Sequence, residues 1–423
     1  MSQTSPGQPA ALSPAATAAQ VHAPLSVGQF VAVMAALMAL NALAIDIMLP
    51  ALPHFRQAFA LADANAAQTV ITAYLVGFGV GQVFMGVLSD RFGRRPILLA
   101  GLLVYGLAAI ASAVSTDMTA LLVARFIQGL GSAAPRVVGV AAVRDCYGGR
   151  QMARVMSLVM MVFMAMPILA PSIGQLILLA APWQAIFAVL AVYAAVMFVV
   201  CWRWLPETLR PEWRRAIRPG PILQAGRSIF GSRQTVGYTL ASGAFFGALL
   251  GFVNSAQQLL GQVFGLGDWF PLAFAVLAGG IAVSSFINAL LVERMGMRSL
   301  SHGATLTFLA VALTMLALAL TGWLTVWTFM PLQVMAMLLA GLVFANFNAL
   351  AMEPQQKVAG IASSLIGAVT ILIGAGGGFL IGQAFDGSAT PLALGFTVSA
   401  SATLIVLLVT ERGRLCRSAP VTD

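Results

Sequence analysis

Long apolar runs alternate with short polar segments along most of this chain. A helix needs about 20 mostly apolar residues to cross the hydrocarbon of a bilayer. The runs that approach this length are 27–50, 66–88, 96–115, 118–142, 155–180, 183–204, 236–260, 269–292, 299–321, 324–349, 359–384 and 390–410. The pattern therefore predicts an all-α polytopic membrane protein with twelve transmembrane helices.

The longest polar interval inside this pattern divides the runs into two groups of six. We expect a six-helix bundle at 26–204, a cytoplasmic linker at 205–235 and a second bundle at 236–410. Residues 1–25 carry no lysine or arginine, so they lack the basic start of a secretory signal. We expect them to form a disordered cytoplasmic tail, and 411–423 to form another.

Composition supports a membrane location and argues against nucleic acid as a partner. The chain has 423 residues, of which 60% are hydrophobic and 8% charged, whereas soluble domains carry about 25% charged residues. The formal net charge is +9, but the basic residues lie between apolar runs, where membrane topology explains them. Three scattered cysteines and three separated histidines suggest no disulfide, metal or cofactor.

The positions of the basic residues predict the orientation in the membrane. With the N-terminus inside, all but three of the 22 basic residues fall on the cytoplasmic side. Arg56 falls on the opposite side, and Arg125 and Arg136 fall within a span. Because basic residues concentrate in cytoplasmic loops, we expect both termini in the cytoplasm.

One polar segment recurs in the two halves of the chain. Asp90-Arg-Phe-Gly-Arg-Arg95 separates the second and third apolar runs, and Glu293-Arg-Met-Gly-Met-Arg298 occupies the same place in the second half. Parallel repeats of six helices are typical of two-bundle transporters, whose binding sites lie between the bundles near mid-membrane.

Several motifs resemble those of a known family of transporters. The segment Gly81–Pro96 resembles the signature of the major facilitator superfamily, and Arg125-Phe-Ile-Gln-Gly129 resembles a motif of proton-coupled drug antiporters. Four further segments are similar to the Bcr/CflA subfamily of drug:H+ antiporters: Asp46-Ile-Met-Leu-Pro-Ala-Leu-Pro53, Tyr74, Val143-Arg-Asp145 and Leu205-Pro-Glu-Thr208. Pro167–Gly174 keeps the prolines of the antiporter motif in helix 5 but lacks most of its glycines.

Two charged residues inside spans are candidates for proton coupling. Asp46 is the only acidic residue that the pattern places well inside hydrocarbon, where a charged Asp costs about 2.5–3.5 kcal/mol. The resemblance implies that Asp46 and Arg125 take part in coupling, with the proton as the coupling ion. Alternatively, Asp46 is a solvated or capping residue near Pro50, and Arg125 binds carbonyls of a broken helix.

A second set of residues is expected to line the cavity. Arg136 follows Arg125 by three helical turns and so lies on nearly the same face; the alternative is a local bond to the carbonyl freed by Pro135. Met160 and Met164 belong to a row of methionines at i+4 spacing, which suits an adaptable site but also ordinary packing. The polar candidates within or at the ends of spans are Tyr74, Gln128, Asn254, Gln257 and Asn346.

The repeated polar segment is expected to act as a cytoplasmic gate. Its charges would hold the bundles together on the cytoplasmic side when the transporter opens outward. The candidate gate residues are Gly86, Asp90, Arg91, Gly93, Arg94, Arg95, Glu293 and Arg294.

Together these features predict a proton-coupled secondary transporter that exports small amphipathic drugs. The resemblance implies a multi-pass protein of the bacterial inner membrane, and we expect a monomer. No GxxxxGK[ST], HExxH or GxSxG occurs, so neither ATP use nor common hydrolytic chemistry is indicated. Two alternatives remain: a transporter narrow for one metabolite, such as an amino acid or nucleoside, and an integral membrane enzyme.

Overall fold

The computed structural model describes residues 25–214 and 226–416. Within these ranges, twelve helices are long and apolar enough to cross a membrane, which confirms the predicted fold class. The expected tail at 1–25 lies, apart from Leu25, outside the described residues, as do 215–225 of the expected linker and 417–423 of the C-terminal tail.

The first six spans are formed by residues 27–204. Their elements are α2 (Val27–Asp46), η1 (Leu49–Ala51), α3 (Leu52–Ala58), η2 (Ala64–Gln68), α4 (Thr69–Phe92), α5 (Arg94–Ala113), α6 (Met118–Cys146), α7 (Gly149–Ala180) and α8 (Gln184–Trp204). A short helical turn, η3 (Pro211–Trp213), follows α8.

The last six spans repeat this order after the linker. Their elements are α10 (Arg233–Gln258), η4 (Leu259–Val263), η5 (Gly267–Trp269), α11 (Phe270–Met295), α12 (Met297–Leu320), α13 (Val326–Met352), η6 (Glu353–Val358), α14 (Ala359–Gln383) and α15 (Thr390–Thr410).

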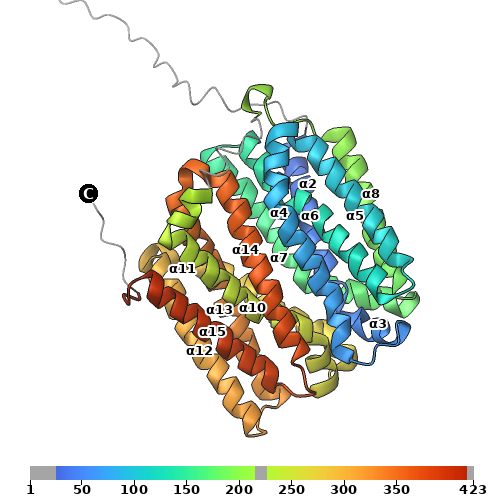
Figure 1. Cartoon of the computed structure of the whole chain (residues 1–423), viewed down its shortest axis with the longest axis vertical. Coiled ribbons are helices and arrows are strands. Elements are labelled where there is room, and N and C mark those ends of the chain that lie inside the picture. Colours follow the sequence, from blue (N-terminus) through green and yellow to red (C-terminus); the bar gives the residue numbers. More distant parts are fainter. Residues whose placement is uncertain (1–24, 215–225, 417–423) are drawn as a thin grey trace, which may run out of the picture.

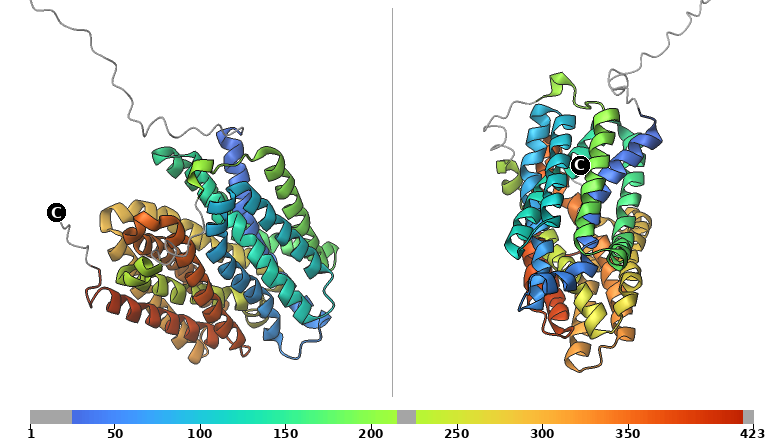
Figure 2. Two further views of the ribbon diagram at one scale, coloured as in Figure 1. Left: turned by 45° about the horizontal axis from the view of Figure 1, so that its top comes forward. Right: turned by 90° about the vertical axis from the view of Figure 1, so that its right-hand side faces the viewer.

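The helices form two bundles that meet chiefly along two pairs of helices. Figure 1 shows the first bundle in blue to green and the second in yellow to red, with α4 and α14 side by side at the boundary. The second contact is between α7 and α11. The left view of Figure 2 also shows the two bundles side by side. Large apolar side chains such as Leu107, Leu179 and Trp327 are exposed on the outside, where a bilayer would cover them.

The repeated polar segment forms the same turn in both bundles. Gly93 lies between α4 and α5 with φ 105°, and Gly296 lies between α11 and α12 with φ 78°. Both glycines adopt positive φ, which other residues rarely do. The two turns, Asp90–Arg95 and Glu293–Arg298, mark what we name the arginine-rich end of the molecule.

Glycines let α4 and α6 approach closely and so position the buried part of α6. A Cβ atom at Gly77 would collide with the backbone carbonyl of Phe126, and one at Gly129 would collide with that of Tyr74. Because only glycine permits this separation, the segment of α6 that carries Arg125 lies directly against α4.

A candidate transport cavity between the bundles

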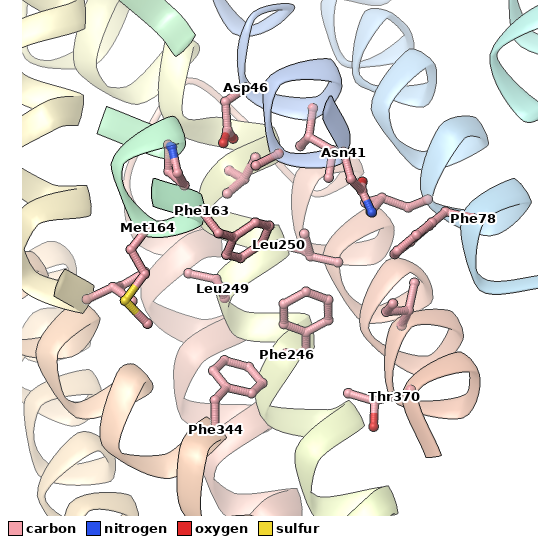
Figure 3. A pocket seen from close by; sticks show the side chains of 18 of the residues that line it. Asn41, Asp46, Phe78, Phe163, Met164, Phe246, Leu249, Leu250, Phe344 and Thr370 are labelled. Carbon is pink, nitrogen blue, oxygen red and sulfur yellow. The ribbon is translucent and has the colours of Figure 1, made fainter. Parts of the chain in front are cut away.

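A cavity of about 440 Å³ lies between the two bundles (Figure 3). Helices α2, α4, α6 and α7 of the first bundle and α10, α11, α13 and α14 of the second contribute to its wall. The wall is mainly apolar and includes the phenylalanines Phe78, Phe163, Phe246, Phe252, Phe274 and Phe344. Among the described lining residues, two carry charge: Asp46 and Arg136.

Asp46 is the last residue of α2, and its side chain reaches the cavity although only 6% of the residue is exposed. Pro50 has no N–H, so the helical bond that would close on the carbonyl of Asp46 cannot form, and the chain continues as the 3-10 turn η1. Figure 3 shows the carboxyl group directed into the cavity. In the described part of the chain, no basic side chain lies within ion-pairing distance of it.

Arg125 is fully buried behind the wall rather than on it. Its Nε donates to the carbonyl of Val70 at 3.2 Å, its Nη1 to Oε1 of Gln128 at 2.8 Å and its Nη2 to the carbonyl of Ala44 at 3.0 Å. These bonds join α6 to α4 and to the end of α2. They match the alternative in which the arginine binds carbonyls of a broken helix.

Tyr74 connects Arg125 to the cavity. The guanidinium of Arg125 lies 4.5 Å from the centre of the Tyr74 ring, a favourable cation–π distance. The Tyr74 hydroxyl donates to Oδ1 of Asn41 at 3.1 Å, and Asn41 lines the cavity. Tyr74 and Gln128, both expected on the wall, therefore lie one layer behind it.

Arg136 lines the cavity three turns along α6 from Arg125. Its Nη1 lies 3.6 Å from the sulfur of Met38, and its guanidinium lies 5.6 Å from the centre of the Phe163 ring. Pro135 does interrupt the bonding of α6, but Arg136 makes no bond to a backbone carbonyl within the described ranges. The local-capping alternative therefore differs from the observed contacts.

The other expected cavity residues are divided between the wall and the helix contacts. Met164 lines the cavity, and its sulfur accepts a bond from the Ser285 hydroxyl of α11 at 3.2 Å. Met160 packs beside the core.

The polar candidates in the second bundle lie away from this wall. Asn254 is buried against Gly382. The side-chain amide of Asn346 donates to Oδ1 of Asn288 at 2.6 Å. Gln257 lines a separate cavity of about 480 Å³.

The charged residues at the arginine-rich end bond within the first bundle. Arg94, which is 4% exposed, pairs with Asp90 at 2.5 Å and with Asp145 at 2.9 Å. Oε1 of Glu207 accepts from the backbone N–H of Arg94 at 2.8 Å and Oε2 from that of Arg95 at 3.3 Å. Glu207 thus caps α5 with a favourable negative charge.

The remaining gate candidates make no ion pair between the bundles. The guanidinium of Arg95 donates a hydrogen bond to the carbonyl of Trp202, and that of Arg91 lies over the ring of Phe92. Glu293 and Arg294 are exposed. In the described ranges the ion pairs are those of Arg94 and of Arg298. Gly86, however, faces Ser364 of α14, so the second bundle packs closely on α4 just before the turn.

Arg298 pairs with acids of its own bundle, as Arg94 does. Its Nε lies 3.2 Å from Glu411, which follows α15, and its Nη2 lies 3.6 Å from Glu353, which follows α13. Tyr238 also donates to Glu411, at 2.7 Å. Each bundle therefore has its own charge cluster at the arginine-rich end.

A network of amide side chains joins the bundles at the opposite end. Nε2 of Gln68 donates to Oε1 of Gln258 at 2.5 Å, and Nε2 of Gln258 donates to Oδ1 of Asn65 at 2.9 Å. Asn65 donates to the carbonyl of Phe385 at 2.8 Å, and Nε2 of Gln383 donates to the carbonyl of Asn65 at 2.8 Å. We name these four residues (Asn65, Gln68, Gln258 and Gln383) the amide latch.

Sequence reasoning missed the phenylalanine-rich wall, Asn41 and the hydrogen bonds of the amide latch. A phenylalanine in an apolar run can face the core, the lipid or a cavity, so its place in the sequence does not predict which of these it faces. Asn41 did carry a signal, because a polar amide five residues before Asp46 in an apolar run is costly unless it faces a cavity or a partner.

Comparison with known proteins agrees with this architecture. A sequence model of the Major Facilitator Superfamily matches residues 34–380. The chain belongs to this superfamily. It is therefore a membrane transporter, and the membrane-enzyme alternative is excluded.

Curated relatives include drug-resistance proteins of the Bcr/CflA type. The chain is 30% identical to a bicyclomycin resistance protein homolog of Haemophilus influenzae over 80% of its own length and 85% of the relative. It is 29% identical to multidrug resistance protein D of Escherichia coli, over 78% and 82% respectively. The resemblance read from the motifs is thus confirmed at the level of family.

A solved structure shares the fold. The partially occluded inward-open form of the xylose transporter from E. coli has a TM-score of 0.70 and 12% identity, covering 93% of this chain and 99% of that chain. At this identity the match concerns the arrangement of helices alone.

Proposed function

We propose that this transporter exports small amphipathic, drug-like solutes in exchange for protons by alternating access. One observation carries the proposal: Asp46 is the one acidic side chain among the described residues that line an otherwise mainly apolar cavity between the bundles. A carboxylate there is costly, so it binds a proton readily or associates with a solute. If Asp46 can bind either a proton or a solute but not both at once, the movements of the proton and the solute are coupled.

The cycle that we propose uses Asp46 as the proton carrier and Arg125 as its support. When the cavity faces outward, Asp46 takes a proton; when it faces inward, the proton leaves and the solute enters. Arg125 holds the broken end of α2 through the Ala44 carbonyl, and thus keeps Asp46 at the wall. One proton moving inward supplies about 2.3 kcal/mol per 100 mV, enough for a roughly 40-fold solute gradient.

The proposed topology places the arginine-rich end in the cytoplasm, together with 1–25, 205–235 and 411–423. The bundles, at 26–204 and 236–410, are hydrogen-bonded to each other at the amide latch, which suits an inward-facing state closed toward the outside. In the outward-facing state, Asp90 and the arginines beside it would extend the contact that Gly86 already makes with Ser364 of α14. We propose a monomer in the bacterial inner membrane.

Relatives and wall chemistry both favour drug-like solutes over a single polar metabolite. The matched relatives are named for resistance to bicyclomycin and to multiple drugs. A wall rich in phenylalanine suits apolar rings better than it suits an amino acid or a nucleoside. A resistance profile limited to one compound would favour the narrow transporter.

Inverted membrane vesicles test the proposal. Respiration acidifies their interior, and addition of an exported solute should dissipate part of that acidification. Asp46→Asn should abolish the response, whereas Asp63→Asn, which changes an acid outside the cavity, should preserve it. An unchanged response in Asp46→Asn would contradict the coupling role.

A further inference from the structure

Arg136 is the one cationic side chain among the described residues that line the cavity, and its donors lack strong acceptors. A guanidinium has five N–H donors, yet the recorded contacts of Arg136 are a sulfur atom and an aromatic ring. The two buried arginines are satisfied differently: Arg125 by three oxygens, and Arg94 by two carboxylates. Arg136 therefore retains donors for a molecule in the cavity.

Arg136 and Asp46 can carry opposite charges but do not form an ion pair. Both line the same cavity, and no ion pair joins them in the described part of the chain. With Asp46 ionised, the wall carries one positive and one negative group and no net charge. Such a wall is a dipole with a donor region at Arg136 and an acceptor region at Asp46.

A cavity of this kind discriminates against charged solutes of either sign. A cation is attracted by Asp46 but repelled by Arg136, so its loss of hydration is not offset. When Asp46 is protonated and supplies no opposing attraction, repulsion by Arg136 at a separation of about 7 Å and an effective dielectric constant of about 20 disfavours a cation by a factor of roughly 50. An anion binds best when Asp46 is protonated, and it would then travel with the proton instead of against it.

We infer that Arg136 restricts the cargo to uncharged apolar solutes that carry a strong hydrogen-bond acceptor, such as a carbonyl, nitro or phosphoryl oxygen. The acceptor binds the guanidinium, and the apolar body packs on rings such as Phe246 and Phe344. This inference rests on the proposed function, because the argument against anions uses proton exchange at Asp46. Arg136 is thus a determinant of specificity, and removing its charge should admit cations.

Three compounds with a common triphenyl body separate the charge classes. Triphenylphosphine oxide is uncharged with a strong acceptor, tetraphenylphosphonium is a permanent cation, and triphenylacetate is an anion. Binding is measured by equilibrium dialysis with the full-length protein in nanodiscs. The wild type should bind the phosphine oxide at least 10-fold more tightly than either ion.

Two variants of Arg136 test its role. Arg136→Gln should weaken binding of the phosphine oxide and strengthen binding of tetraphenylphosphonium, each by about 10-fold. Arg136→Lys keeps the charge and should continue to exclude the cation. A thermal unfolding scan verifies that both variants are folded, and Arg56→Gln, which lies outside the cavity, should resemble the wild type.

The outcomes separate this inference from the proposed function. An unchanged ratio of the two affinities in Arg136→Gln, or failure of the wild type to bind the phosphine oxide, would overturn the role of Arg136. Solute-induced proton movement through the wild type would still stand in that case. Conversely, a reversed ratio without any proton movement would uphold Arg136 as the filter and refute antiport.

Discussion

Nη2 of Arg125 donates to the carbonyl oxygen of Ala44 at 3.0 Å, two residues before the acidic side chain that enters the cavity. The bond ties α6 to the point at which α2 breaks. In the proposed cycle Arg125 therefore acts on Asp46 through the backbone, because no ion pair between the two is present in the described ranges. Positioning, rather than direct charge pairing, is the role that this geometry supports.

Replacement of Arg125 should damage both stability and exchange. Arg125→Ala removes the three hydrogen bonds that the guanidinium donates to Ala44, Val70 and Gln128, and a hydrogen bond from a charged donor contributes about 1.5–3 kcal/mol. We expect a loss of about 2–4 kcal/mol in SDS-titrated unfolding in mixed micelles. Arg125→Lys keeps the charge but not the planar fork, so exchange should fall at least about 10-fold.

A lipid-facing position on the same helix provides the control. Val123 is exposed, and Val123→Ala should leave both measurements nearly unchanged. Wild-type exchange in a folded Arg125→Lys variant would show that the three-oxygen geometry is unnecessary.

Breaking the amide latch should shift the conformational equilibrium. Gln258 bonds both Gln68 and Asn65, so Gln258→Leu removes two neutral hydrogen bonds of about 1 kcal/mol each. The population open at the latch end should rise roughly 30-fold relative to the closed one. The measurement is labelling of a single cysteine at Ala42, on the cavity wall, by an impermeant thiol reagent applied from outside.

Gln57 is a suitable comparison for the latch. Gln57 is exposed and lines the separate cavity at the same end that also contains Gln257. Gln57→Leu should leave the labelling rate unchanged. Equal rates in Gln258→Leu and the wild type would mean that the latch does not hold the bundles closed.

Arg94 and Arg91 lie three residues apart, but the structure predicts different contributions to stability for them. Arg94→Gln strands Asp145, whose side chain is 8% exposed, and removal of one partner of a buried pair costs about 3–5 kcal/mol. Arg91 is exposed, so Arg91→Gln should change unfolding by less than about 0.5 kcal/mol. The same SDS titration checks both, and similar effects of the two substitutions would contradict the observed pairing.

The number of helices could be predicted from sequence, whereas their rotation could not. The faces of a transmembrane helix that contact lipid, pack in the core or line an apolar cavity are all apolar, so the hydrophobic pattern does not distinguish them. Asp46, Arg136 and Met164 line the cavity. Asn254 and Asn346 do not line it. They are buried between helices, Asn254 by tight packing and Asn346 by hydrogen bonding, and the sequence does not distinguish such a site from a cavity wall.

Long-range partners were equally invisible in the sequence. Leu205–Thr208 was recognisable as a motif, but Glu207 caps α5 through the backbone of Arg94 and Arg95, more than a hundred positions earlier. The members of the amide latch are likewise distant in sequence. Equivalent turns at Gly93 and Gly296 could be foreseen, since the same local residues recur in both halves.

Solute-induced proton release by the purified protein tests the central claim most directly. In a weakly buffered solution with a pH indicator, binding of an exported solute should release up to one proton per wild-type molecule from Asp46. Asp46→Asn should release none while remaining folded. Equal release by the wild type and Asp46→Asn would contradict proton exchange at this residue.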